Sequence, residues 1–157
     1  MSLLQSISKE TFSETFSAQN SAEDMRLYLE NDLSIDKLKS ELNDVESEFY
    51  FAILNDRITA YLKIKFGTNQ EKSSLEIERI YVLKSFQGLK IGQTLLDKAI
   101  QIAGQRPVDF IWLGVWEKNL KAINFYKKNG FTHYGEHIFM LGNDAQTDIL
   151  MRRETKV

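Results

Sequence analysis

The residues of this chain that could do chemistry gather in the stretch ERIYVLKSFQGLKIGQTLLDKAI, residues 78–100. Its first half has the β-branched and aromatic residues typical of a strand, and its second half has the apolar spacing of an amphipathic helix. A helix that begins directly after a turn exposes unpaired backbone N–H groups at the positive end of its dipole. The joint at residues 87–92 therefore predicts a binding site for an anion such as a phosphate.

Two familiar phosphate-binding motifs do not match this turn. The P-loop requires Gly-Lys-Ser/Thr, whereas Lys90 is followed by Ile91. The dinucleotide fingerprint requires three glycines in the order G-x-G-x-x-G, and the turn contains Gly88 and Gly92. From these residues alone, an ordinary helix start stays open as the alternative, with Gly88 serving turn geometry and Gly92 close packing.

The composition of the whole chain limits the class of protein that could contain this turn. The 157 residues with 43% hydrophobic content predict a single domain, residues 1–157. The chain contains no cysteine, so disulfides, thiolate metal sites and cysteine nucleophiles are excluded. Without a long apolar run or a secretory signal, the expected location is cytoplasmic with no membrane partner. The basic residues form no dense run, which argues against a nucleic-acid partner.

Periodicity predicts the elements that must position the turn. Ser21 and Ser34 have the residue type and place of helix N-caps. The Asn55-Asp56 pair predicts a tight hairpin turn, and residues 67–73 have the polarity of a loop. The order of helices, antiparallel strands and one strand-helix-strand crossover indicates an α+β fold with a mixed sheet. Helices are predicted at 8–17, 21–44, from about 88, and 119–129; strands are predicted at 48–55, 57–66, 75–83, 108–115, 131–141 and 147–154.

Two motifs connect these elements to a known superfamily. FQGLKIGQTLL resembles the pyrophosphate-binding turn of the GNAT N-acetyltransferases, in which Gln or Arg, two residues, Gly, any residue, and Gly or Ala follow one another. Gln87 and Gly92 match, and Lys90 replaces the first glycine. NLKAINFYKKNGF, residues 119–131, is similar to the family segment Asn-x-x-Ala-x-x-Phe-Tyr-x-x-x-Gly-Phe at all six positions. We expect Lys90 to be helical here, with its ammonium near the cofactor phosphates.

The resemblance implies a fold and a co-substrate. The expected GNAT fold has a mixed, mostly antiparallel sheet of six to seven strands, a V-shaped splay between its two central strands, and helices on both faces. Acetyl-CoA would lie in the splay, with its pantetheine arm against the backbone of the 75–83 strand. The residues implied for cofactor binding are Ile80, Tyr81, Val82, Gln87, Gly88, Leu89, Lys90, Ile91, Gly92, Gln93, Asn119 and Tyr126.

The resemblance also implies catalytic roles for an acetyl transfer by direct attack of the amine. Tyr126 would protonate the departing thiolate, and the backbone N–H of Tyr81 or Val82 would stabilise the oxyanion. Glu78 is the candidate general base, because many members use a glutamate on this strand. Glu117 and solvent stay open as alternatives, as does a surface role for Glu78 in an ion pair.

Strand alternation makes a further prediction about this glutamate. Unless a bulge intervenes, successive side chains point to opposite faces of the sheet. Glu78 would then lie closer to the cleft than Glu76. The expected faces are Glu76, Glu78, Ile80 and Val82 on one side, and Ile77, Arg79 and Tyr81 on the other.

The distribution of charge along the chain indicates which kind of acceptor molecule the enzyme would bind. Residues 1–56 carry twelve acidic and four basic residues, whereas the whole chain has a net charge of −2. In the superfamily the N-terminal helices form the acceptor side, so an acidic rim would favour a cationic amine. The segments KETFSETFSAQNSAEDMRLYL, GVWEKN and GEHIFMLGNDAQTDILM are similar to a bacterial branch that acetylates spermidine and spermine. The sequence therefore predicts a small-molecule amine as acceptor, with a polyamine first.

Several alternatives stay open. One is acetylation of a protein N-terminus or lysine, and another is a non-catalytic module that binds acetyl-CoA and regulates a partner. A homodimer is neither required nor excluded. His133 and His137 would share a strand face, but without a third ligand no metal site is predicted. Trp112 is expected in the core, and Trp116 either in the core or at the acceptor pocket.

Overall fold

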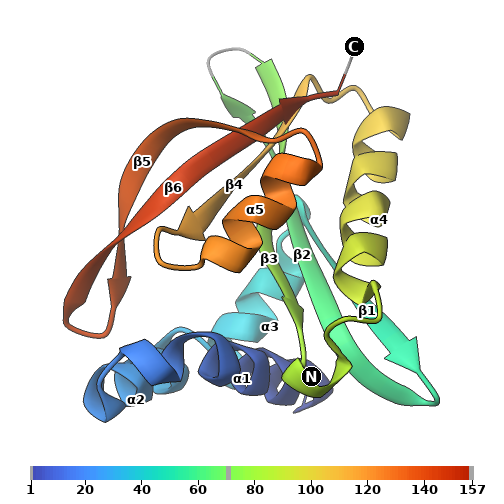
Figure 1. Cartoon of the computed structure of the whole chain (residues 1–157). Helices are drawn as coiled ribbons and strands as arrows, with labels where there is room; N and C mark the ends of the chain where they lie inside the picture. The colour runs from blue at the N-terminus through green and yellow to red at the C-terminus, as the bar shows by residue number, and fades with distance from the viewer. Residues whose placement is uncertain (1, 70–71, 156–157) are drawn as a thin grey trace.

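The structure is a computed structural model in which residues 2–69 and 72–155 are described. One six-stranded sheet, in the order β1-β2-β3-β4-β6-β5, organises this part of the chain (Figure 1). Neighbouring strands are antiparallel except for β3 and β4, which are parallel. This arrangement confirms the predicted α+β fold with a mixed, mostly antiparallel sheet. The strands are β1 (Ser47–Leu54), β2 (Arg57–Asn69), β3 (Lys72–Val82), β4 (Phe110–Trp116), β5 (Thr132–Leu141) and β6 (Asp144–Glu154).

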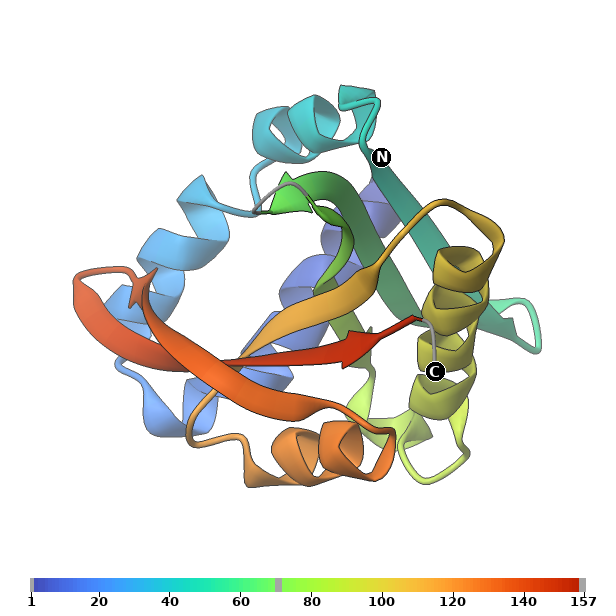
Figure 2. The same ribbon diagram turned by 90° about the horizontal axis from the view of Figure 1, so that it is seen from above.

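Helices cover both faces of the sheet, as predicted, and each face has its own core. Buried residues of α4 and α5 pack with one face. Buried residues of α1, α2 and α3 pack with the other, and the view from above in Figure 2 shows the two groups on opposite sides of the strands. No helix in the described ranges is long and apolar enough to cross a membrane. The helices are α1 (Ser2–Phe16), α2 (Ala22–Asn31), α3 (Ile35–Asn43), α4 (Ile91–Gln105) and α5 (Leu120–Lys128), with short 3-10 turns at Ser17–Gln19 and Lys84–Phe86.

The N-terminal helices differ from the prediction in their boundaries. The predicted caps are confirmed, because Ser21 and Ser34 accept hydrogen bonds from the backbone N–H of Asp24 (3.1 Å) and Lys37 (3.2 Å). The helical periodicity predicted over 21–44 is interrupted at the second cap, because α2 ends at Asn31 and α3 begins at Ile35, directly after Ser34. Leu33 is only 1% exposed. The break buries Leu33 between the two short helices.

The β1–β2 hairpin is confirmed. Leu54 pairs with Arg57, and both Asn55 and Asp56 have positive φ, as a type I′ turn requires. The loop predicted at 67–73 is wrong where the structure describes it. Residues 67–69 and 72–73 continue the β2–β3 ladder, because backbone pairing at this exposed end needs no apolar side chains. Residues 70 and 71 lie outside the described residues.

The central splay is the feature that positions the site. β3 and β4 pair only from Ser74 with Phe110 to Ile77 with Leu113. Beyond that point β3 runs on to Val82 and β4 to Trp116 without further pairing between them. The predicted V-shaped opening between the two central strands is therefore confirmed.

Candidate active site

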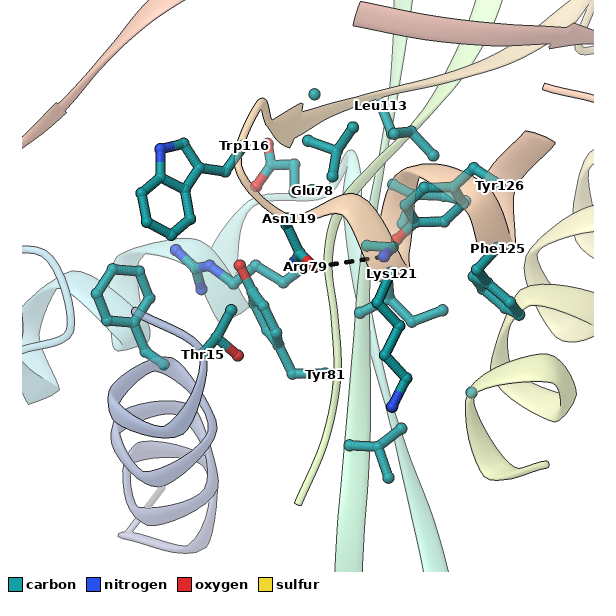
Figure 3. Close-up of a pocket in the computed structure, with 18 of the residues that line it drawn as sticks. Thr15, Glu78, Arg79, Tyr81, Leu113, Trp116, Asn119, Lys121, Phe125 and Tyr126 are labelled. Atoms are coloured by element: carbon teal, nitrogen blue, oxygen red, sulfur yellow. Dashed lines mark hydrogen bonds between the residues drawn. The ribbon is translucent and has the colours of Figure 1, made fainter. Parts of the chain in front are cut away.

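A cavity of about 750 Å³ occupies the splay and is lined from both faces of the sheet. On one side its walls come from α1 and α2, including Phe16 and Tyr28. On the other side they come from α4, including Ile91. They also come from α5, including Phe125 and Tyr126 (Figure 3). The cavity thus passes through the sheet, so two ligands could approach each other from opposite faces.

The turn before α4 presents its backbone N–H groups toward this cavity. Within the described residues, the N–H groups of Gly88, Leu89, Lys90, Ile91, Gly92 and Gln93 have no hydrogen-bond partner. The N–H of Gln87 is taken, because it donates to the Lys84 carbonyl at 3.2 Å. The first N–H groups of any helix lack intrahelical acceptors, and consecutive free N–H groups form a concave anion site. The cradle therefore has six donors, one fewer than predicted from residues 87–93.

Lys90 has a left-handed backbone, with φ of 63° and ψ of 21°. The expectation that it would be helical is wrong. The chain must reverse between the 3-10 turn Lys84–Phe86 and α4, and Gly88 (φ 86°) and Lys90 share that reversal. A lysine in this region costs on the order of 1–2 kcal/mol relative to its usual conformation. Lys90, which replaces the first glycine of the motif, thus adopts a backbone conformation that glycine reaches without this cost.

Polar side chains brace the same turn. The ammonium of Lys121 donates to Oε1 of Gln87 at 3.1 Å, and Nε2 of Gln87 donates to the Val82 carbonyl at 3.3 Å. Gln93 and Asn129 exchange two side-chain hydrogen bonds of 2.8 and 3.2 Å, which join the start of α4 to the end of α5. Lys121 was not identified from the sequence, because nothing along the chain shows that α5 crosses the turn.

The β3 edge offers backbone groups to the gap. The Leu83 N–H donates to the Thr59 carbonyl at 2.9 Å. In an antiparallel ladder the bonded residues alternate, so the Tyr81 N–H also faces β2 while Ile80 and Val82 face the gap. Of the two oxyanion donors predicted, the Val82 N–H is therefore available and the Tyr81 N–H is not.

Tyr126 and Asn119 lie on α5 at the centre of the cavity wall. Tyr126 is buried, with its hydroxyl directed into the cavity (Figure 3), and burial raises its pKa above the ordinary tyrosine range. Asn119 caps α5 by accepting the Ala122 N–H at 3.3 Å. Both predicted residues thus line the same cavity as the turn.

A bulge in β3 changes the face of Glu78. Lys63 pairs with Arg79 and Ile64 pairs with Ile77, so Glu78 is the extra residue. The predicted alternation is therefore wrong after this point: Ile77 and Ile80 both pack toward α4. The Glu78 carboxylate instead forms an ion pair with the ammonium of Lys63. Bulges are frequent next to active sites because they redirect a side chain in this way.

Glu76 lies in the cavity wall and differs from Glu78. Within the described chain it has no hydrogen-bond or ion-pair partner, and it is partly buried. Burial raises the pKa of Glu76 to about 7, and the neighbouring Glu78 adds to the shift. The reserve candidate Glu117 is exposed and does not line the cavity.

The opposite arm of the splay adds a third carboxylate. Asp148 on β6 lines the cavity beside His137 on β5, and burial raises its pKa. Gly114 leaves room for it, since a Cβ there would lie 3.2 Å from Oδ2 of Asp148. Trp112 and Trp116 also line this end; Trp116 belongs to a buried core cluster, whereas Trp112, expected in the core, is only partly buried.

The source of the negative charge is not the predicted one. Among the described residues that line the cavity, those from residues 1–56 are apolar, aromatic or hydroxyl-bearing. The acidic side chains there come from β3 and β6. Acidic residues of the N-terminal helices instead pair with bases or face outward, because a helix bundle exposes its charged faces. No group of three metal-ligating side chains occurs in residues 2–69 and 72–155.

A split sheet, a run of free N–H groups at a helix start and an adjacent unpaired strand edge are features suited to binding an extended anionic cofactor. The model of the acetyltransferase (GNAT) family matches residues 5–131. An uncharacterized N-acetyltransferase in the pepI 3′ region of Lactobacillus delbrueckii subsp. lactis is 42% identical over 151 residues, or 94% of this chain and 87% of that protein. An uncharacterized N-acetyltransferase of Mycobacterium bovis is 28% identical over 127 residues, or 81% of this chain and 80% of that protein.

The solved structures agree on the fold. A PaiA N-acetyltransferase from Thermoplasma acidophilum, crystallised in complex with coenzyme A, superposes with a TM-score of 0.81 at 22% identity, covering 98% of this chain and 91% of that one. The chain belongs to the acetyltransferase (GNAT) family and is an acetyl-CoA-dependent N-acetyltransferase. The six free N–H groups and the open β3 edge fit acetyl-CoA as its co-substrate.

Proposed function

We propose that this enzyme acetylates a primary amine of a small cationic molecule, with a polyamine such as spermidine or spermine as the acceptor. The opposite charges at the two ends of the cavity carry the proposal. Lys90, Lys121 and the N-terminus of α4 lie at one end, whereas Glu76 and Asp148 line the other part without an ion-pair partner among the described residues. Glu78 and Arg79, which also line that part, are paired with Lys63 and Glu41. An anionic cofactor and a protonated amine would each meet complementary charge on opposite sides of the sheet.

The cofactor's thioester supplies the activated acetyl group, and the chain's own residues bind and orient it. The N–H groups of residues 88–93 would hold the diphosphate, with Lys90 and Lys121 adding positive charge. The free edge at Ile80 would pair with the pantetheine amides, as a strand edge pairs with an extended peptide. The Val82 N–H would serve as the oxyanion donor.

We assign the general base to Glu76 in preference to Glu78. The Glu78 carboxylate is engaged by Lys63, whereas Glu76 has no partner among the described residues and lines the cavity. With a pKa of about 7 it would be half ionised near neutrality. An ammonium of ordinary pKa near 10.4 would transfer its proton uphill by roughly three units, which desolvation in the cavity would reduce.

Tyr126 is proposed as the donor to the departing sulfur. Because burial raises its pKa, full proton transfer to a thiolate whose thiol titrates near about 8.5 is unfavourable. Its contribution would be a positioned hydrogen bond that strengthens as charge develops on sulfur. Asn119, next to it in the cavity wall, would bond the cofactor near the acetyl group.

A mass-spectrometric screen of amines with acetyl-CoA tests the acceptor. We expect spermidine and spermine to be acetylated with kcat/KM at least about tenfold above a neutral primary amine of similar length, because charge complementarity is lost in the latter. If a peptide N-terminus or lysine is acetylated in preference to the polyamines, the acceptor is a protein or peptide and the polyamine proposal is wrong. Binding of acetyl-CoA without turnover of any amine would favour the non-catalytic regulatory module, although Tyr126 and Asn119 both lie in the cavity wall.

Glu76→Gln tests the base. We expect a loss of at least about 10²-fold in kcat/KM at neutral pH, the usual contribution of a general base. Glu117→Gln is the matched control, because it removes the same charge from an exposed position outside the cavity. An unchanged rate in Glu76→Gln would assign the proton to solvent or another group.

A further inference from the structure

A buried ion cluster lies beneath the acceptor half of the cavity. Lys63 on β2 is 4% exposed, and its ammonium contacts the carboxylates of Glu41 from α3 and Glu78 from β3. Arg79 on β3 also pairs with Glu41, at 2.9 Å. The cluster has two cations and two carboxylates, so its members compensate one another.

Burial fixes which side chains pair within this cluster. An ammonium taken out of water without partners costs several kcal/mol, so Lys63 must keep both carboxylates close. Its side chain also lies over the Phe49 ring, 5.7 Å from the centroid, which fixes its direction. Glu78 can meet Lys63 because the bulge places it as the extra residue of β3. Glu76, two residues earlier on the same strand, keeps no partner among the described residues.

We propose that Lys63 is a positioning residue: held by Glu41, its ammonium engages Glu78, so that Glu76 alone is left to accept the proton of the acceptor amine. The inference rests on the proposed role of Glu76. It adds a reason for two glutamates on one strand, namely that one is the base and the other is an ion-pair partner for Lys63. It also links α3, outside the cavity wall, to the chemistry through Glu41.

Charged groups from several elements act on Glu76. Lys63 and Lys65 of β2 lower its pKa, and Glu78 on its own strand raises it. Burial raises the pKa of the Tyr134 hydroxyl on β5, and Glu76 lies near enough to raise it further. Lys65 is half exposed and 3.6 Å from Asp44, so solvent weakens its influence. Lys63 is the buried cation of this set.

The proposal predicts in which direction the pKa of Glu76 shifts when either charge of the Lys63–Glu78 pair is removed. Removing the Lys63 ammonium leaves Glu78 uncompensated beside Glu76, so the protonated form of Glu76 is favoured and its pKa rises. Removing the Glu78 charge while Lys63 stays paired with Glu41 has the opposite effect. The shifts are expected to be about one unit or more in each direction, the size that a close charge produces in a partly buried site.

The test is an NMR titration of the Glu76 carboxyl carbon in the cofactor-free protein labelled with ¹³C-glutamate, with the signal assigned by its loss in Glu76→Gln. Lys63→Met should raise the apparent pKa, Glu78→Gln should lower it, and Lys63→Arg should return it to within about 0.3 units of the parent. Lys98→Met is the matched control, since Lys98 is an exposed lysine of α4 over the Tyr50 ring. Lys98→Met should leave the apparent pKa of Glu76 unchanged.

The acid limb of the kcat/KM profile with spermidine should move with the titration. If Glu76 titrates identically in the parent, Lys63→Met and Glu78→Gln, the inference is overturned, whatever the acceptor proves to be. If the titration moves and the rate profile does not, Lys63 keeps its role and the assignment of Glu76 as base fails instead. Should Lys63→Met fail to fold by circular dichroism, Glu78→Gln alone decides, because it keeps the Lys63–Glu41 pair.

Discussion

The conformation of Lys90 allows its charge and its backbone to be tested separately. Its left-handed backbone, φ 63°, costs any non-glycine residue about 1–2 kcal/mol, while glycine loses about 0.5–1 kcal/mol more chain entropy on folding. Lys90→Gly should therefore change stability by less than about 1 kcal/mol, or roughly 2–4 °C in Tm. Lys90→Ala keeps the strain and removes the charge. Lys90→Val adds a β-branch that resists this region.

Coenzyme A affinity then divides into two contributions. Lys90 is exposed, so its ammonium should contribute about 0.5–1 kcal/mol, which is a factor of about 2–5 in Kd. Lys90→Gly and Lys90→Ala should both weaken binding by that factor, less at high salt. Lys90→Val should weaken it by at least about tenfold, because a turn that loses its left-handed residue no longer aligns the N–H groups of residues 88–93.

Isothermal titration calorimetry with coenzyme A at two salt concentrations measures these values, and thermal unfolding supplies the stability. If Lys90→Val binds as well as Lys90→Ala, the conformation of the turn is irrelevant to binding and the cradle is refuted. If Lys90→Gly and Lys90→Ala both abolish binding while the fold is intact, the lysine and not the amide cradle is the main ligand.

Three further substitutions test other parts of the structure. Tyr126→Phe should lower kcat by about 10²-fold and leave coenzyme A affinity unchanged, because the ring keeps its packing and only the donor is lost. Gly114→Ala should raise KM for the amine, since the new Cβ would lie 3.2 Å from Oδ2 of Asp148 at the acceptor end. Gly142→Ala should lower the free energy of unfolding by about 2–4 kcal/mol, because φ is 60° and the Cβ would lie 2.7 Å from Cα of Asp24.

Kinetics, calorimetry and denaturant unfolding give these three results directly. Unaltered turnover in Tyr126→Phe would contradict its role as the hydrogen-bond donor. If Gly114→Ala raised the KM for acetyl-CoA and not the KM for the amine, Gly114 would lie at the cofactor end of the cavity and not at the acceptor end. Gly104→Ala is the control for the glycine substitutions, since a Cβ in this helical position meets nothing within 4 Å. It should be neutral or stabilising by up to about 1 kcal/mol. A Gly142→Ala protein as stable as this control would refute the close approach to Asp24.

Local signals predicted much of the fold. The caps at Ser21 and Ser34 and the Asn55-Asp56 turn depend on interactions within a few residues, so the sequence contains them whole. The cap at Ser34 marks the start of α3, but the burial of Leu33 between α2 and α3 is a tertiary contact that the sequence does not show. The loop predicted at 67–73 was wrong for a related reason, since pairing of β2 with β3 outweighed local polarity.

The candidate site divides in the same way. The turn before α4 and the Tyr126 helix were recognisable because their residue types and spacing are set by backbone geometry. An ion pair of Glu78 stood among the alternatives, but its partner Lys63 could not be predicted, because a bulge is a mismatch between two strands and only the register of β2 shows it. Asp148, Lys121 and Lys63 meet the site across elements distant in sequence, and no local pattern marks them.

By itself, then, the sequence determined the helix caps, the hairpin turn and the α+β order of elements, and its two motifs resembled those of the GNAT family, because these features depend on local residue types and spacing. Only the tertiary structure decided which carboxylates line the cavity and which of them are paired with cations. The interaction between two charged groups depends on their distance in space and on their burial, so their separation along the chain does not predict it. The acidic N-terminal third and the acidic cavity are for that reason different parts of the molecule.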